Sequence, residues 1–383
     1  MGEPPSLMTH IKSPKAILLV LFVLAILVCP LKGGLRAGPS NPDEPFNAGA
    51  MIIDHIVDTY EWHIASVGDF HLSVPLPVIL IDQGKLHVFM SSAFHHGTTA
   101  YKGYEIAKEG FNKGKIVRYE ADGTLVRPLD FSITKNVFAV FVASALIIFL
   151  FLHIAKAYDR TRRHAPKGIQ SMLEPLILFI RDEVVRSSIG EKHYEKFLPY
   201  LLTVFFFIFL NNIFGLIPIF PLGANVTGNI AVTGVLAFFT FMMIVVKANK
   251  DYWKHIFNTP GVPWFLKLPI PLMPIIEIVG MFTKPFVLMV RLFANITAGH
   301  IIILGFISLI FVFGKSNVYA GFGMSALSVS LAIFMNFLEL LVAFIQAFVF
   351  TLLSALFLGM AVEEHHHEEH HPGGHHPNET HHA

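Results

Sequence analysis

Long apolar runs, interrupted by short polar or charged segments, make up most of the second half of this chain. Three of these runs have the length of one membrane crossing and lie at 136–158, 197–218 and 230–246. A helix needs about 20 apolar residues to cross the hydrocarbon core upright. We therefore predict one transmembrane helix for each run.

Two further apolar runs, 272–313 and 324–362, are about twice as long as one crossing requires, and the short segment "GKSNVYAGFG" joins them. Helices of that length must tilt steeply or lie nearly in the plane of the membrane. The pattern thus predicts an all-α polytopic membrane protein. It has five transmembrane helices within a membrane domain at 133–362, and the last two form a long, steeply tilted hairpin at 272–362.

Residues 168–189 show a different pattern, because their apolar side chains share one side of a helix. Met172, Leu176 and Phe179 fall on that side, whereas Glu174 and Arg181 fall elsewhere. An amphipathic helix of this kind is typical of segments that lie on a membrane surface. We predict a surface helix here.

Residues 41–132 alternate apolar and polar positions, as in "FHLSVPLPVILI" and "KLHVFMSS", and "ADGTL" is typical of a turn. We predict a small extramembrane segment of α+β or β-rich structure. Four of its residues are possible metal ligands, although scattered surface histidines are the simpler interpretation: His55, Glu61, His63 and His71.

The N-terminal residues 1–40 have the features of a secretory signal. Lys12 and Lys15 precede the apolar run "AILLVLFVLAILVC", which is short for a membrane span. A cleaved signal peptide is favoured. An uncleaved N-terminal anchor is the alternative, because no clear cleavage motif follows the run.

Composition agrees with a membrane protein, since 54% of residues are hydrophobic, 14% are charged and the mean hydropathy is +0.59. We expect membrane lipid around it. A net charge of +1 gives no reason to expect nucleic acid as a partner. The single cysteine, Cys29, excludes a disulfide framework. The segment 363–383 is rich in histidine and favours a solvated cytoplasmic tail, which could bind metal ions adventitiously.

The charged loops set an orientation. The segments at 156–167 and 247–254 are basic, which places them in the cytoplasm by the positive-inside rule. Residues 41–132 then lie outside the cytoplasm, in the periplasm of a bacterium, and the C-terminus lies inside. We expect a multi-pass protein of the bacterial inner membrane.

Arg291 stands deep in an apolar run, where a fixed charge is costly. An arginine keeps its proton, so its counter-charge must come from another helix, another subunit or a transported ion. At 100° per residue, Glu277, Lys284 and Asn295 share a stripe with it that is about 40° wide. Snorkelling towards a helix end is a simpler interpretation for Glu277 and Lys284, but not for Arg291. His300 points to the opposite face.

The motifs "KPFVLMVRLFANITAGH" and "ELLVAFIQAFVFTLLSALFLGMAVEEH", with "NNIFGLIP" and "NVTGNIAVT" before them, closely resemble subunit a of the rotary proton-driven ATP synthase. The resemblance covers roughly residues 130–364, in order and with matching spacings. It does not extend to residues 1–130, which are longer than in most members of the family.

The resemblance implies a function in proton transport. Two offset half-channels would load and unload protons on the carboxylates of a rotating c-ring (subunit c), and Arg291 would pair with each carboxylate and bar a direct leak. Asn295 and Gln346 match positions beside that arginine. His300 and Glu339 match the pair that lines the outer half-channel, with acid and histidine exchanged between the helices, and Glu277 would line the exit to the cytoplasm.

Further partners implied by the resemblance are the subunit b stalk and the remaining ATP synthase subunits. The chain would not be an enzyme alone, and we expect no cofactor. Two alternatives remain. An ion-coupled secondary transporter would be expected to have discontinuous helices and an internal repeat. Sodium could replace the proton, although a histidine and carboxylate pair favours protons.

Overall fold

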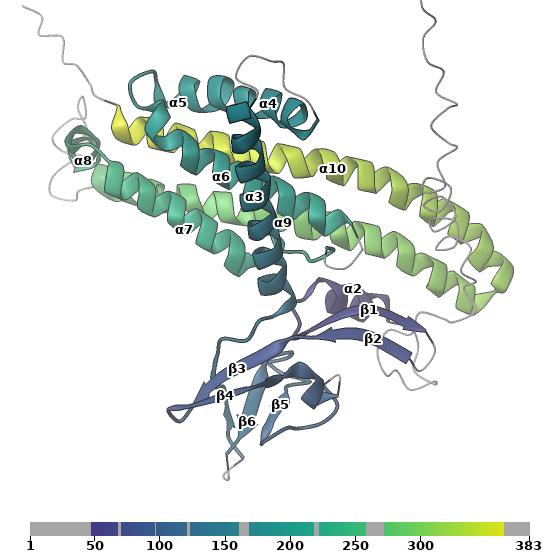
Figure 1. Cartoon of the computed structure of the whole chain (residues 1–383). Helices are drawn as coiled ribbons and strands as arrows, with labels where there is room; N and C mark the ends of the chain where they lie inside the picture. Colours follow the sequence, from purple (N-terminus) through teal and green to yellow (C-terminus); the bar gives the residue numbers. More distant parts are fainter. Residues whose placement is uncertain are drawn as a thin grey trace, which may run out of the picture.

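The computed structural model describes residues 47–67, 70–95, 97–120, 123–160, 168–217, 222–257 and 272–363. A layer of long helices lies above a small group of strands (Figure 1). The predicted signal or anchor at 1–40 and the predicted tail beyond residue 363 lie outside the described residues. The limits of those two segments stay predictions.

Within the described residues, five helices are long and apolar enough to cross a membrane. They are α3 (Lys135–Arg160), α6 (Tyr194–Leu216), α7 (Ile230–Lys247), α9 (Leu272–Ser316) and α10 (Val318–Val362). Each agrees with a predicted run to within a few residues, except at the joint between the last two. The predicted fold class is confirmed.

The hairpin of α9 and α10 is the largest element of the fold, and each helix has 45 residues. Such a helix is about 68 Å long, at 1.5 Å per residue. The hydrocarbon core is only about 30 Å thick, so both helices must lie far from the membrane normal. Figure 1 shows them running together at a large angle to α3.

The segment "GKSNVYAGFG", which was predicted to join these helices, forms the end of α9 and the start of α10. Only Asn317 separates them, and its side chain accepts a hydrogen bond of 2.9 Å from the Tyr319 backbone N–H, as a helix N-cap does. A side chain at Gly321 would meet the Cα of Gly314 at 2.7 Å. The two glycines therefore let the helices approach closely, and this packing overrides the weak helix propensity of the segment.

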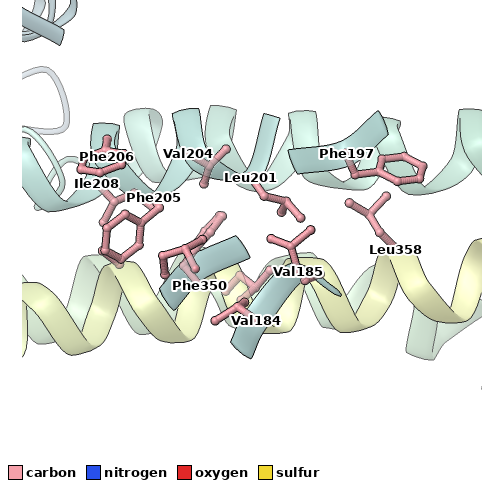
Figure 2. Close-up of a cluster of buried hydrophobic side chains, with 14 of the residues drawn as sticks. Val184, Val185, Phe197, Leu201, Val204, Phe205, Phe206, Ile208, Phe350 and Leu358 are labelled. Carbon is pink, nitrogen blue, oxygen red and sulfur yellow. The ribbon is translucent and has the colours of Figure 1, made fainter. Parts of the chain in front are cut away.

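Helix α6 packs against α10 of the hairpin and also contacts α3 and η3. Its aromatic and branched side chains meet α10 in a cluster that Figure 2 shows in close-up. Phe205, Phe206 and Leu201 are fully buried there, as is Leu358 from α10. This core fixes α6 against α10.

The amphipathic segment predicted at 168–189 is helical in three parts: α4 (Ile169–Phe179), the π-helical η3 (Ile180–Arg186) and α5 (Ser187–Ile189). Val184 and Val185 of η3 are fully buried in the α6–α10 core. Gly359 of α10 lies directly against the Ser188 carbonyl oxygen, so this segment sits on α10. The basic segment at 247–254 was expected to be a loop. That expectation is wrong in part, because Lys250–Phe257 forms helix α8.

The N-terminal domain (residues 47–132) lies on the side of the helical layer opposite α4 and α5 (Figure 1). It contains a short helix and antiparallel strands in three small sheets, ordered β1-β2, β4-β3-β8 and β5-β6-β7. Its elements are α2 (Ala48–Ile56), β1 (Glu61–Val67), β2 (Phe70–Pro75), β3 (Pro77–Asp82), β4 (Lys85–Met90), η2 (Ser91–Phe94), β5 (Tyr104–Ile106), β6 (Ile116–Tyr119), β7 (Leu125–Val126) and β8 (Leu129–Asp130).

The strands of this domain enclose a core of their own. Val78, Leu80, Phe94 and Ile116 are fully buried in it. Tyr60 closes one side, and its hydroxyl donates a hydrogen bond to the Asp130 carboxylate. Burial, and then this bond, raise the pKa of Tyr60 well above its usual range.

Candidate functional site

His300 and Glu339 form a buried pair between α9 and α10. The imidazole Nδ1 of His300 lies 2.7 Å from Oε1 of Glu339, and their side chains are 14% and 4% exposed. The same Nδ1 lies 3.1 Å from the Ile296 carbonyl oxygen. The Glu339 carboxylate has no other partner among the described residues. A carboxylate buried in this way depends on the imidazole for its counter-charge.

Two glycines make room for this pair. A Cβ on Gly299 would lie 2.7 Å from Oε1 of Glu339, so the carboxylate packs directly against the α9 backbone. A Cβ on Gly215 of α6 would lie 3.8 Å from Nε2 of His300. The ring and the carboxylate therefore occupy space that larger residues at these positions would take.

A row of polar contacts lies beside the pair, and the sequence interpretation gave these residues no role. Thr227 donates a hydrogen bond of 2.6 Å to the Asn212 side-chain oxygen. The Asn212 amide in turn donates one of 3.2 Å to the Ala343 carbonyl oxygen. Ala343 lies between Glu339 and Gln346 on the buried face of α10. Both polar side chains come from "NNIFGLIP" and "NVTGNIAVT", motifs that could have identified them.

Arg291 lies on a different face of α9. Its side chain is exposed, and within the described residues it has neither a hydrogen bond nor an ion pair. Nine residues correspond to half a turn more than two full turns, so Arg291 and His300 point away from each other, as the spacing predicted. Asn295, one turn along from Arg291, is exposed as well. Gln346 is buried on α10, and its contact with Arg291 stays a prediction.

The other two polar residues of the predicted stripe lie towards the opposite end of α9. The ammonium of Lys284 lies 5.2 Å from the centre of the Phe357 ring, a cation–π contact with α10. Glu277 lies near Tyr252 of α8. Burial, and then the charge of Glu277, raise the pKa of Tyr252. The stripe therefore runs from the exposed Arg291 to a half-buried acid near α8.

This arrangement combines two kinds of charge. An imidazole beside a carboxylate can pass a proton, because each group gains or loses one at an accessible cost when the other responds. A guanidinium cannot lose its proton and so acts only as a fixed cation. In the part of the chain that the structure describes, no three histidine, cysteine or acidic side chains gather as metal ligands.

Two family profiles match this chain, and one of them covers the residues of this site. The profile of the ATP synthase A chain family matches residues 137–359, and a domain of unknown function matches residues 51–131. The first match covers both members of the buried pair and Arg291. The second covers most of the N-terminal domain.

Individual relatives extend this likeness. ATP synthase subunit a of Chloroherpeton thalassium is 40% identical over 282 residues, which are 72% of this chain and 78% of the relative. ATP synthase subunit a 2 of Chlorobium luteolum is 47% identical over 256 residues, 63% of this chain and 71% of the relative. ATP synthase subunit a of an Anaeromyxobacter species is 38% identical over 350 residues, 88% of this chain and 76% of the relative. The chain therefore belongs to the ATP synthase A chain family, the subunit a of ATP synthases.

Proposed function

We propose that this chain provides two offset half-channels through which protons reach and leave the carboxylates of a rotating c-ring. Membership of the family supports the coarser statement, a proton-channel subunit in the membrane sector of ATP synthase. The finer proposal rests chiefly on one observation. Arg291 is a permanent cation on an exposed, apolar face of α9 with no counter-charge among the described residues.

A cation in this position needs an anion from outside the chain, because an unpaired charge at membrane depth is costly. A carboxylate that passes on a neighbouring subunit meets that need transiently. The arginine attracts the deprotonated carboxylate and favours release of its proton. It also repels hydronium, so it opposes a direct path between the half-channels.

His300 and Glu339 are assigned to the half-channel on the outer side. They lie in the half of the hairpin nearer its Asn317 turn, and His300 faces α6 and α10, away from the exposed face of Arg291. Glu277 is assigned to the exit, near the opposite end of α9. Asn295 and Gln346 are assigned to the surroundings of the arginine. The close pairing of histidine with glutamate supports protons over sodium as the coupling ion.

The partners follow from the same proposal. The exposed face of α9 around Arg291 receives the c-ring, and the subunit b stalk and the remaining ATP synthase subunits complete the complex. Membrane lipid covers the other apolar surfaces. A secondary transporter is less well supported, because α9 and α10 run without the breaks that substrate sites in such proteins need.

We propose that the N-terminal domain lies in the periplasm and α8 in the cytoplasm of a bacterium with this chain in its inner membrane. The basic segments before α4 and around α8 support this orientation. In a Cys29→Ser background, Phe111→Cys should react with an impermeant maleimide in intact cells, since Phe111 is fully exposed. Lys250→Cys should react only after the cells are opened. The reverse pattern of labelling would contradict the orientation.

The central test is Arg291→Ala in the complete complex. Moving one proton through 100 mV is worth about 2.3 kcal/mol, so coupling requires that protons do not bypass the ring. We expect ATP synthesis and ATP-driven pumping to be lost while passive proton leak persists. Arg291→Lys should also fail, because an ammonium lacks the planar fork and can lose its proton when desolvated. Both proton flux and synthesis are measured in the same vesicles.

Lys284→Arg is the matched control, because it keeps a cation on the same stripe and an arginine also stacks on the Phe357 ring. This variant should still synthesise ATP. Near-normal synthesis by Arg291→Ala would disprove the proposed function.

A further inference from the structure

Hydrogen bonds and packing contacts hold the N-terminal domain to the membrane domain, in addition to the single chain connection before α3. The Asp58 carboxylate accepts hydrogen bonds from the Asn136 backbone N–H at 3.0 Å and from the Thr134 hydroxyl at 2.8 Å, at the start of α3. The Lys135 backbone N–H donates to the Thr59 carbonyl oxygen at 2.9 Å. Helix α2 packs against α9. These contacts hold the domain in one place over the helical layer.

Trp62 makes the central contact between the two parts. It lies on β1 opposite Val74, and only 4% of it is exposed. Its ring meets Phe138 of α3 edge-on, with ring centres 5.8 Å apart. It also packs against Ala224 and Val226, which are 2% exposed. The indole therefore covers the outer loop (residues 222–229), which connects α6 to α7.

The outer loop leads directly to the buried pair. Beneath Trp62, the carbonyl oxygen of Ala224 lies 3.4 Å from the Cβ position of Gly215, and that position is 3.8 Å from Nε2 of His300. Three residues further along, Thr227 donates its hydrogen bond to Asn212. A shift of the outer loop would therefore change both the surroundings of the imidazole and the polar row beside it.

Little space lies under this loop. A cavity of about 10 Å³ is lined by Ala139 of α3, Asn211 and Phe214 of α6, and Gly223 and Val226 of the loop. That is room for about one water molecule. A displacement of the loop by the width of a water molecule would therefore alter which groups water can reach.

We propose that Trp62 is a positioning residue, which holds the outer loop over His300, and that the N-terminal domain thereby sets how readily protons reach the His300–Glu339 pair from outside. This inference rests on the proposed function, because it concerns proton uptake into the outer half-channel. Trp62 acts through the loop and does not itself carry a proton.

The test compares Trp62→Ala with the parent complex in proteoliposomes whose lumen bathes the N-terminal domain. ATP synthesis is measured while the lumenal pH is varied, with the outside pH and the membrane potential fixed. We expect the lumenal proton concentration that gives half-maximal synthesis to rise about three- to tenfold in Trp62→Ala. Synthesis in acidic lumen should approach the parent rate, because abundant protons compensate for slower uptake.

Trp62→Phe should restore most of the parent pH profile, since a phenyl ring also covers Ala224 and Val226. Val88→Ala is the matched control in the same domain, because Val88 is 58% exposed on β4. It should leave the profile unchanged. Should Trp62→Ala fail to assemble, Val226→Ala thins the same contact from the loop side and should shift the profile in the same direction.

An unchanged half-maximal concentration in Trp62→Ala would overturn this inference. So would an equal loss of rate at every lumenal pH, which indicates only a damaged complex. Arg291→Ala, measured in parallel, separates the two proposals. If it synthesises ATP, the proposed function fails. If it does not, while Trp62→Ala and Val226→Ala keep the parent profile, only the role of Trp62 is wrong.

Discussion

Two faces of α9 carry charge in opposite ways. On one face, Arg291 is exposed and has no ion pair among the described residues. On the other, His300 is mostly buried and meets Glu339 at 2.7 Å. The buried pair supplies its own counter-charge within the chain, whereas the arginine does not. Under the proposed function, the buried face would serve a proton path within the chain and the exposed face would receive a second subunit.

The small residues around each group follow the same division. Ala294 and Ala298 are exposed near Arg291, so another helix can approach that face closely. At Gly299, next to His300, the Glu339 carboxylate of the same chain instead occupies the space that a side chain would take. Small side chains thus admit an external neighbour on one face and an internal acid on the other.

The largest effect on proton pumping is expected from removing one member of the buried pair. His300→Leu or Glu339→Leu leaves its partner buried without a counter-charge, and the proton relay loses a group. We expect ATP-driven proton pumping to fall about tenfold or more in each variant. The exchange of the two, His300→Glu with Glu339→His, should be milder than the worse single change, because a matched pair remains.

Ser330→Ala is a control on α10, because Ser330 is exposed and its hydroxyl donates a hydrogen bond to the Ala326 carbonyl oxygen of the same helix. It should pump normally. Normal pumping by both single leucine variants would show that the pair is not on the proton path. The proposed difference in function between the two faces of α9 would then be wrong.

Much of this arrangement follows from the sequence. The lengths of the apolar runs predicted five long helices, because the thickness of a bilayer sets how many residues a crossing needs. The helical period placed Arg291 and His300 on opposite faces, and the structure agrees. That His300 meets Glu339 came from the resemblance to a family, since residues on two helices have no fixed angle to each other in the sequence.

Other features depend on contacts between distant residues and could not be predicted from local pattern. The segment around Asn317 contains glycine, asparagine and serine, which are typical of loops. It is helical because Asn317 caps α10 and Gly314 packs against Gly321. The hydrogen bond from Thr227 to Asn212 and the cover by Trp62 likewise arise only once α3, α6 and β1 are placed together.

A smaller effect is expected from Gly299→Ala, which tests how closely the acid is held against α9. The new Cβ would lie 2.7 Å from Oε1 of Glu339, well inside normal contact distance. The carboxylate ends a flexible side chain, so it can move aside and lengthen its contact with His300. We expect ATP-driven pumping to fall about two- to fivefold, while the assembled complex remains stable, because overpacking of this kind is partly relieved by local shifts.

Gly323→Ala is the matched control, since a Cβ there meets nothing within 4 Å. Both substitutions remove a helical glycine and gain about 1 kcal/mol of helix propensity, so that gain cancels in the comparison. What remains is the contact between position 299 and the carboxylate. If the two variants pump equally well, Glu339 is not held against the α9 backbone. The buried face of α9 would then tolerate an added side chain as readily as the exposed one, which is the distinction that this pair of variants is designed to measure.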